Sequence, residues 1–297
     1  MFISIHLSKL RSWLLLILLM LNLLLIALIC YPILVDPSTS QTDVQHPYSV
    51  SHVELPILMY HDILKSPARQ QPYVISPAKL EQDLIFLCDN GYQTVVTQDI
   101  VAFVEYGEPL PSKPIMITFD DGYFNNVFYA EPLLKKYQMR AVIFVVGAYC
   151  ERAVKEGEEN PNYSYIQWDR LSQMAEGGIW DIQCHSWNLH AVSGGRMGVQ
   201  KRSSQSESQY LDALHCDFAQ ITDKLTEITG SPPLAFAYPY GAMSEQADDV
   251  LKELGYKVTV CSNHGKSTLI YGQPETLFRL RRLARVNNRS ARSLLTP

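Results

Sequence analysis

The sequence predicts one α/β domain built on a parallel sheet, either open or closed into a barrel. The chain has 297 residues, of which 47% are hydrophobic, and this suits a globular protein with a sizeable core. From Leu55 onward, short apolar runs alternate with amphipathic segments. Several runs are apolar on both alternating faces, as a buried parallel strand requires. Such alternation over about 230 residues is typical of α/β domains.

The expected elements follow in chain order. Strands are expected at residues 55–60, 93–96, 114–119, 141–146, 179–184, 234–238 and 256–260. Helices are expected between them. Ser76-Pro77 has the pattern of an N-cap followed by proline at the first helical position. Apolar residues of 210–229 recur at steps of three and four until Gly230, and the Gly- and Ser-rich segment 193–209 is expected to be a mobile loop.

An almost wholly apolar run, residues 13–35, precedes this domain. It is about as long as the ~20 residues that a membrane-spanning helix needs. Lys9 and Arg11 precede the run, which predicts a cytoplasmic segment 1–12 and a body on the extracytoplasmic side, in the periplasm or at the cell surface. A cleaved signal peptide is the alternative, but its apolar region is usually about 7–15 residues long. We favour an uncleaved signal anchor, followed by a polar linker at 36–52 and the domain at 53–297.

Charge and cysteine content limit the classes of partner. The net charge of −5 is mild, so the sequence carries no broad basic footprint for nucleic acid. The six cysteines show neither a CxxC pair nor zinc-finger spacing. The one basic cluster consists of the arginines at 279, 281, 282, 285, 289 and 292. It is compatible with anionic glycan or lipid headgroups, but we interpret it as a solvated face.

Two adjacent carboxylates, Asp120 and Asp121, follow the apolar run 114–119. Functional residues of parallel α/β domains gather at the C-terminal ends of strands. Two neighbouring like charges repel each other and resist burial, so their position at the end of a buried strand requires an explanation. The alternative is an ordinary Asp-Gly turn.

Two histidines, His185 and His190, follow another apolar run, 179–184. Two imidazoles and a carboxylate suit a first-row divalent metal and leave coordination positions open for water and substrate. One aspartate neutralised by a metal and another accepting a proton as general base would explain the adjacent carboxylates. A third strand end, Tyr238–Gly241, offers a backbone N–H and an aromatic wall to stabilise an oxyanion, or simply a turn.

The motifs "TFDDG", "HSWNLH" and "YPYG", in this order and at these intervals, resemble the polysaccharide deacetylases of the NodB-homology family, carbohydrate esterase family 4. The resemblance covers roughly residues 54–290. "PILMYHDI" and the five-residue step between the histidines are most similar to exported poly-N-acetylglucosamine deacetylases. The resemblance implies a distorted, incomplete (β/α) barrel with parallel strands, and removal of acetyl groups from N-acetylglucosamine units.

The resemblance also assigns roles to matching residues. Asp120 matches the catalytic base, and the metal ligands match Asp121, His185 and His190. Tyr240 matches the residue whose backbone N–H helps to hold the oxyanion formed when activated water attacks the acetamide. We expect zinc as the divalent metal, with cobalt, nickel or iron also compatible. Tyr238 and Pro239 are expected to contact substrate, and Trp187 either to stack on a sugar or to pack.

Two departures from the family pattern leave roles unfilled. Many members have an arginine where this chain has Ala237, and it braces the catalytic aspartate, so the partner must come from elsewhere or be absent. Many members also end on a Leu-x-His motif whose histidine protonates the leaving amine, and "LFRLRRLARV" contains no histidine. The candidates for additional catalytic groups are His61, at the end of the first strand, and His264.

These features predict a membrane-anchored, metal-dependent hydrolase that N-deacetylates an extracytoplasmic glycan. Poly-N-acetylglucosamine, peptidoglycan and chitin-like chains present the same acetamide, and an envelope polysaccharide export or synthesis machinery is a candidate partner. One alternative is a catalytically decayed glycan-binding or assembly protein. The other is a glycoside hydrolase that uses Asp120 with a second acid, for which adjacent aspartates backed by two histidines are a poor fit.

Overall fold

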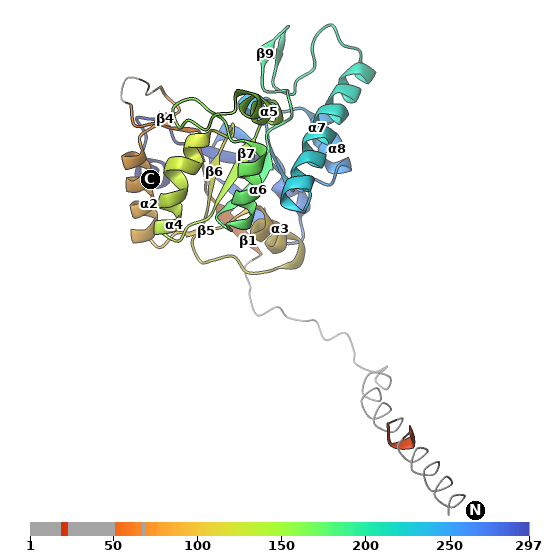
Figure 1. Ribbon diagram of the computed structural model, residues 1–297. Helices are drawn as coiled ribbons and strands as arrows, with labels where there is room; N and C mark the ends of the chain where they lie inside the picture. The colour runs from red at the N-terminus through yellow and green to blue at the C-terminus, as the bar shows by residue number, and fades with distance from the viewer. Residues whose placement is uncertain (1–18, 23–50, 67–68, 70, 297) are drawn as a thin grey trace, which may run out of the picture. The chain divides into compact units, whose positions relative to one another are not determined.

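The computed structural model describes residues 19–22, 51–66, 69 and 71–296 (Figure 1). The chain divides into two compact units, residues 1–49 and 50–297. In the first unit the described residues 19–22 are helical. The predicted anchor 13–35 and linker 36–52 therefore lie almost wholly outside the described residues. Across the described ranges, no helix has the length and apolar character needed to cross a membrane.

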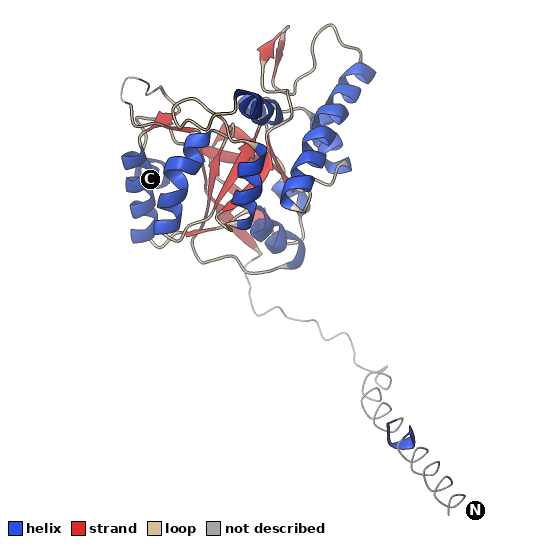
Figure 2. Cartoon of the chain, in the orientation of Figure 1, coloured by secondary structure: helices blue, strands red, loops and turns tan. Residues whose placement is uncertain are grey.

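A closed barrel of parallel strands forms the centre of the second unit (Figure 2). In ring order its seven strands are β2 (Ile57–Tyr60), β14 (Leu280–Ala284), β12 (Val258–His264), β11 (Ala235–Ala237), β8 (Trp180–Cys184), β7 (Ala141–Val145) and β6 (Pro114–Phe119). Pairing of β6 with β2 closes the ring. An eighth strand, β5 (Gln93–Thr94), lies outside the ring and pairs with the start of β6. The predicted incomplete (β/α) barrel with parallel strands is confirmed.

The predicted strands account for β5 and for six of the seven barrel strands. Residues 55–60 divide at Pro56 into β2 and a separate strand β1 (His52–Leu55), which pairs antiparallel with β13 (Ser267–Ile270). The barrel strand absent from the prediction is β14, which closes the barrel beside β2. Arg282 is buried at its centre, and a charged residue there breaks the apolar pattern by which buried strands are recognised.

Helices cover the outside of the barrel (Figures 1 and 2). They are α2 (Pro77–Asp89), α3 (Thr97–Tyr106), α4 (Glu131–Lys136), α5 (Gly147–Glu156), α6 (Trp168–Glu176), α7 (Glu207–Thr229), α8 (Glu245–Glu253) and α9 (Ala291–Leu295). Ser76 caps α2 by accepting a hydrogen bond from the Lys79 N–H, and Gly230 ends α7 in the left-handed conformation, as predicted. The segment expected as a loop contains part of a short hairpin, β9 (Val192–Ser193) and β10 (Arg196–Met197).

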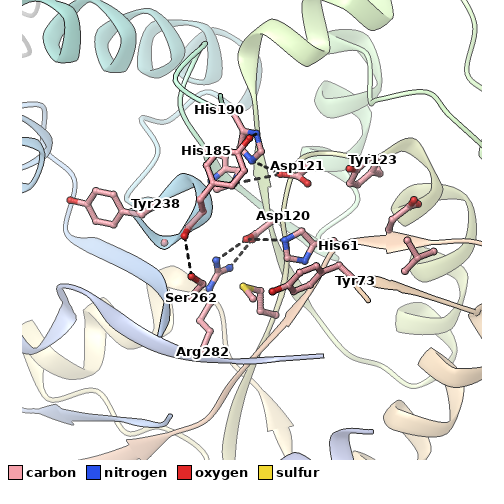
Figure 3. Close-up of a pocket in the computed structure, with 15 residues that line it drawn as sticks. His61, Tyr73, Asp120, Asp121, Tyr123, His185, His190, Tyr238, Ser262 and Arg282 are labelled. Carbon is pink, nitrogen blue, oxygen red and sulfur yellow. Dashed lines mark hydrogen bonds and ion pairs between the residues drawn. The ribbon is translucent and has the colours of Figure 1, made fainter. Parts of the chain in front are cut away.

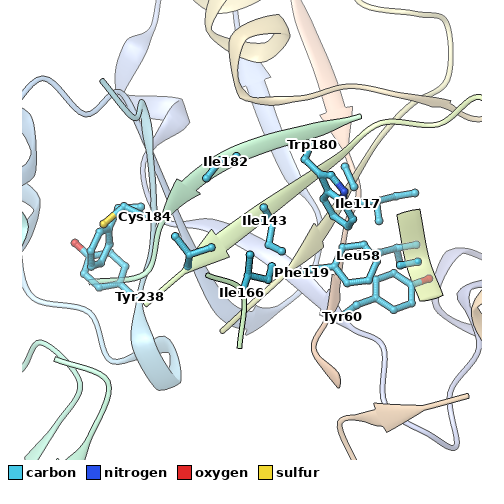
Figure 4. Packing of buried hydrophobic residues seen from close by; sticks show 14 of the residues in the cluster. Leu58, Tyr60, Ile117, Phe119, Ile143, Ile166, Trp180, Ile182, Cys184 and Tyr238 are labelled. Atoms are coloured by element: carbon cyan, nitrogen blue, oxygen red, sulfur yellow. The ribbon is translucent and has the colours of Figure 1, made fainter. Parts of the chain in front are cut away.

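The barrel strands bury both of their faces, in two separate hydrophobic clusters. On β6, Ile117 and Phe119 face the helices, where Phe119 packs on Tyr60 and Trp180 (Figure 4). Met116 belongs to the cluster inside the barrel. Because side chains alternate along a strand, Thr118 continues this inward face, and the next inward position is Asp120. The strand geometry therefore directs one carboxylate toward the barrel axis.

Candidate active site

Most of the sequence-predicted residues meet in a cavity of about 390 Å³ at the C-terminal ends of the barrel strands (Figure 3). Asp120 and Asp121 come from the loop after β6, and His185 and His190 from the loop after β8. Tyr240 follows β11, and His61 follows β2. Three motifs that are distant in sequence thus line one cavity.

A candidate metal group consists of Asp121, His185 and His190. The Oδ1 atom of Asp121 lies 3.0 Å from Nε2 of His190 and 3.5 Å from Nε2 of His185. One ligand atom from each residue lies within 4.8 Å of the other two. This spacing is compatible with coordination of a single small cation.

The protonation of these residues tests whether they fit a metal. Nδ1 of His185 lies 2.6 Å from the Ala237 carbonyl oxygen, which only accepts, so Nδ1 carries the hydrogen. Burial lowers the pKa of His185 to about 4, so at neutral pH its Nε2 has a free lone pair. Oδ1 of Asp121 is buried and accepts no hydrogen bond from any described residue. Converging lone pairs on buried atoms fit a bound divalent cation.

The charge of Asp121 follows from opposing effects. Burial alone would raise the pKa of its carboxyl group, but the contact with His190 and the fields of His61 and His185 outweigh burial and lower it. The pKa of His190 is raised, because its contact with Asp121 and the charge of Asp120 outweigh the effect of burial. Asp121 is therefore anionic at neutral pH.

Asp120 is paired with Arg282. The guanidinium donates two parallel hydrogen bonds of 2.7 Å to the two carboxylate oxygens, and both side chains are almost completely buried (Figure 3). Arg282 Nε also donates to the Cys261 carbonyl. Burial would raise the pKa of Asp120, but Arg282, together with His185 and His61, outweighs burial and lowers it. Asp120 therefore stays charged and able to accept a proton.

The identity of this arginine corrects the interpretation of the basic cluster. The interpretation as a solvated face is wrong for Arg282 and also for Arg285, which is buried and donates to Asp83 at 2.5 Å. Arg279 is paired with Asp248 at 2.6 Å. The arginine absent at Ala237 is replaced from a different strand, within residues 277–286, where four arginines lie among apolar residues and no pattern singles out Arg282.

His61 lies on the other side of Asp120. Its Nε2 is 3.9 Å from the Asp120 carboxylate, its ring packs on Tyr73, and its Nδ1 is buried without a hydrogen-bond partner among the described residues. The Asn126 side chain donates to the His61 carbonyl at 2.7 Å. Asn125 holds the next residues by accepting from Ile63 N–H and donating to Asp62. The two asparagines of the "FDDGYFNN" segment thus fix the strand end that presents His61.

The turn Tyr238–Gly241 forms one wall of the cavity. The hydroxyl of Tyr238 points away into the protein and donates to Asp248 at 2.5 Å (Figure 3). Tyr240 is about half exposed at the cavity, and a β-carbon on Gly241 would lie 1.9 Å from Ser262 Oγ. Pro239 is buried and does not line the cavity, so a direct substrate contact by Pro239 lacks a geometric basis.

Two further candidates lie away from the cavity. His264 is exposed at the end of β12 and is not among the lining residues. Trp187 stacks on Trp168, with ring centroids 5.9 Å apart and planes 18° apart, and does not line the cavity. The structure therefore supports packing for Trp187 and removes the geometric basis for His264. The cavity also includes Asp62, Tyr73, Tyr123 and Ser262, which the sequence analysis did not single out.

The backbone is strained in each of the three motif loops. Asp121, Ser186 and Tyr240 have φ angles of 71°, 75° and 60°. Residues other than glycine are uncommon in this left-handed region, and such conformations often occur at functional sites. The loops therefore hold their residues in conformations that the surrounding packing must maintain.

A family model described as polysaccharide deacetylase matches residues 107–259, slightly more than half of the chain. The chain belongs to the polysaccharide deacetylase family. A relative from Escherichia coli (strain K12), named poly-beta-1,6-N-acetyl-D-glucosamine N-deacetylase, is 26% identical over 217 residues, which cover 67% of this chain and 32% of that protein. The protein of the same name from Staphylococcus aureus (strain N315) is 26% identical over 188 residues, with 62% and 60% covered.

The solved structures agree on the fold. A de-N-acetylase from Aggregatibacter actinomycetemcomitans superposes with a TM-score of 0.66 and 25% identity, over 78% of this chain and 94% of that chain. The match to the E. coli deacetylase spans about a third of that relative's length. Membership in the family therefore rests on the barrel domain.

Replacing Arg282 tests the buried ion pair. We expect Arg282→Met to lower the free energy of unfolding by about 3–5 kcal/mol at pH 7, because Asp120 would remain buried without a partner. The loss should shrink at low pH, where Asp120 becomes protonated. Urea unfolding of the full-length chain measures both effects. The double variant Asp120→Asn/Arg282→Met should lose less than the single one, and a fully stable Arg282→Met protein would contradict the pairing.

Asp217 of α7 makes the stability of the protein depend on pH, through its hydrogen bonds to the loop after β8 that carries His185 and His190. Its two oxygens accept the N–H groups of Trp187 and Asn188 at 2.8 and 2.7 Å, and burial raises its pKa to about 6. The folded protein thus holds this proton to a higher pH than the unfolded chain does. The resulting stabilisation is complete below about pH 4 and is lost as the pH rises through about 6.

Comparison with Asp217→Asn isolates this contribution. We expect the unfolding free energy of the wild type, relative to that of the variant, to fall between pH 4 and pH 7. Urea unfolding of both full-length proteins at several pH values measures the difference in unfolding free energy. The contributions of all other ionisable groups are common to both proteins and cancel in this difference. A difference independent of pH would mean that Asp217 keeps an ordinary pKa.

Proposed function

We propose that the chain is a metal-dependent hydrolase that removes N-acetyl groups from N-acetylglucosamine units of an extracytoplasmic polysaccharide. The main support is that a buried carboxylate and a group of residues suited to a cation lie side by side in one cavity. Asp120 is held as a carboxylate by Arg282, and beside it Asp121, His185 and His190 bring one potential ligand atom each to within 4.8 Å of the others, which fits a cation. A base next to a metal group is suited to hydrolysis of an amide.

We assign each residue a role in this reaction. Asp121, His185 and His190 would hold the metal, for which we expect zinc, with cobalt, nickel or iron as alternatives. A bound divalent cation supplies Lewis acidity, which lowers the pKa of water and polarises a carbonyl oxygen. Asp120 would take the proton from the attacking water. The Tyr240 N–H would stabilise the oxyanion.

His61 is our candidate for the acid that protonates the leaving amine. It lines the cavity, and its Nε2 lies 3.9 Å from Asp120. The position of His61 at the end of β2 supports this assignment, since the C-terminal stretch has no histidine in the matching position. His61 and Asp120 would then divide the two proton transfers between an acid and a base.

The names of the relatives support the proposed substrate. Both the E. coli and the S. aureus protein are named for poly-β-1,6-N-acetylglucosamine. We place this polymer first, ahead of peptidoglycan and chitin-like chains with the same acetamide. We further propose that residues 13–35 anchor the chain, that the domain acts in the periplasm or at the cell surface, and that it works with a polysaccharide export or synthesis machinery.

The two alternatives are weaker in light of the site. A decayed glycan-binding protein would explain the missing arginine and the missing C-terminal histidine, but Arg282 supplies an arginine beside Asp120 from β14, and His61 is our candidate for the missing acid. A glycoside hydrolase needs a carboxylic acid that remains protonated. In the alternative that pairs Asp120 with a second acid, the neighbouring Asp121 is unsuited to be that acid, because its pKa is lowered and its Oδ1 faces two imidazoles, which suits a cation.

Acetate release from defined oligosaccharides tests the proposal. We expect the full-length chain to free acetate from poly-β-1,6-N-acetylglucosamine oligomers, and Asp120→Asn to reduce kcat by about 10²–10⁴-fold while still binding metal. Treatment with a chelator should abolish activity, and added Zn²⁺ or Co²⁺ should restore it. Shortened chains without acetate would indicate a glycoside hydrolase, and glycan binding without either product would indicate a decayed enzyme.

A further inference from the structure

We propose that Tyr149, on α5, is a positioning residue for the metal group. Its hydroxyl fixes the His190 ring and tautomer so that Nε2 faces Asp121. This inference rests on the metal site in the proposed function, but it concerns a residue outside the three motifs and outside the cavity lining.

The contacts of the Tyr149 hydroxyl determine the direction of the hydrogen bonds. The oxygen lies 3.1 Å from Nδ1 of His190 and 3.4 Å from the carbonyl oxygen of the same residue. A carbonyl only accepts, so the hydroxyl hydrogen goes to it, and the phenol oxygen is then free to accept from the Nδ1–H. A neutral ring with its hydrogen on Nδ1 has its lone pair on Nε2, which is 3.0 Å from Asp121 Oδ1.

His185 is held in an equivalent way. Its Nδ1 donates to the Ala237 carbonyl, and its Nε2 faces the same Asp121 oxygen. Each imidazole thus has one neutral acceptor behind it. Ligating histidines commonly donate their second N–H to such a group, which fixes the tautomer and the ring orientation.

Tyr149 is itself held firmly. Its ring lies 4.4 Å from that of Tyr165, and the Arg152 guanidinium lies over both rings, 5.1 and 4.8 Å from their centroids. A tyrosine phenol is neutral at physiological pH and keeps its hydrogen, which Tyr149 donates to the His190 carbonyl.

The first turn of α5 is hydrogen-bonded to the loop after β8 that carries His185 and His190. The N–H groups of Gly147 and Ala148 donate to the carbonyls of Ser186 and Trp187 at 3.1 and 2.8 Å. A β-carbon on Gly147 would lie 2.3 Å from the Trp187 ring, so glycine permits this close approach. These bonds set the distance between Tyr149 and His190 independently of the hydroxyl.

Tyr240 is a competing acceptor. Its hydroxyl lies 3.3 Å from the same His190 Nδ1, but its side chain is about half exposed at the cavity. Tyr149 has the shorter distance, the second bond to the His190 carbonyl and the closely packed neighbours Tyr165 and Arg152. We therefore assign the supporting role to Tyr149, and a Tyr240 variant distinguishes the two.

The test is metal affinity of the full-length chain. The Kd for Zn²⁺ is measured by competition with a chromophoric chelator, and the visible absorption of Co²⁺ reports the ligand geometry. We expect Tyr149→Phe to weaken Zn²⁺ binding by about 10–100-fold and to alter the Co²⁺ bands, because it removes one oxygen and keeps the packed ring. Tyr165→Phe is the matched control and should bind as the wild type does. Melting of the metal-free proteins checks that each variant is folded.

Two outcomes would overturn the assignment: wild-type affinity in Tyr149→Phe, or the full loss in Tyr240→Phe instead. Failure of the wild-type chain to bind either metal would overturn this inference together with the metal dependence proposed above. A wild-type chain that binds Zn²⁺ but frees no acetate would refute only the proposed function, because the affinities of the variants still decide the role of Tyr149.

Discussion

The buried pair of Asp120 and Arg282 is the interaction on which the rest of the site depends. A carboxylate inside the barrel is tolerable only if a partner compensates for the water that it loses, and Arg282 does so with two hydrogen bonds. The two residues are 162 positions apart, one directly after β6 and the other at the centre of β14. The strand that closes the barrel therefore also carries the charge that keeps the base ionised. The site is complete only when β14 has closed the barrel.

The same constraint explains the second aspartate. Asp121 is also buried, which is unusual for a loop residue with a charge. Among the described residues no arginine forms an ion pair with it, and its Oδ1 accepts no hydrogen bond. Its close neighbours are imidazole nitrogens. Adjacent carboxylates can share one strand end because each has a different compensating charge, a guanidinium for one and a site suited to a cation for the other.

Much of this arrangement was predictable from sequence, because apolar runs that end in Asp-Asp and in two histidines identify both the strands and their functional ends. β14 was not predictable in this way, since Arg282 interrupts its apolar pattern, and the benefit of burying that arginine depends on Asp120, far away in the chain. Tyr149 gives no signal at all, because an aromatic residue on a helix is usually a packing residue. Its role depends on the path of the loop between His185 and His190, which only three-dimensional packing fixes.

The left-handed backbone at Asp121, Ser186 and Tyr240 has a consequence for how the molecule moves. Conformations of this kind cost about 1–3 kcal/mol each and persist only while their surroundings hold them. The three loops around the cavity therefore hold conformational strain that the barrel strands do not. Hydrogen exchange at these loops would then occur through small local openings well below the energy of global unfolding, and occupancy of the cavity would slow that exchange most strongly at the three motif loops.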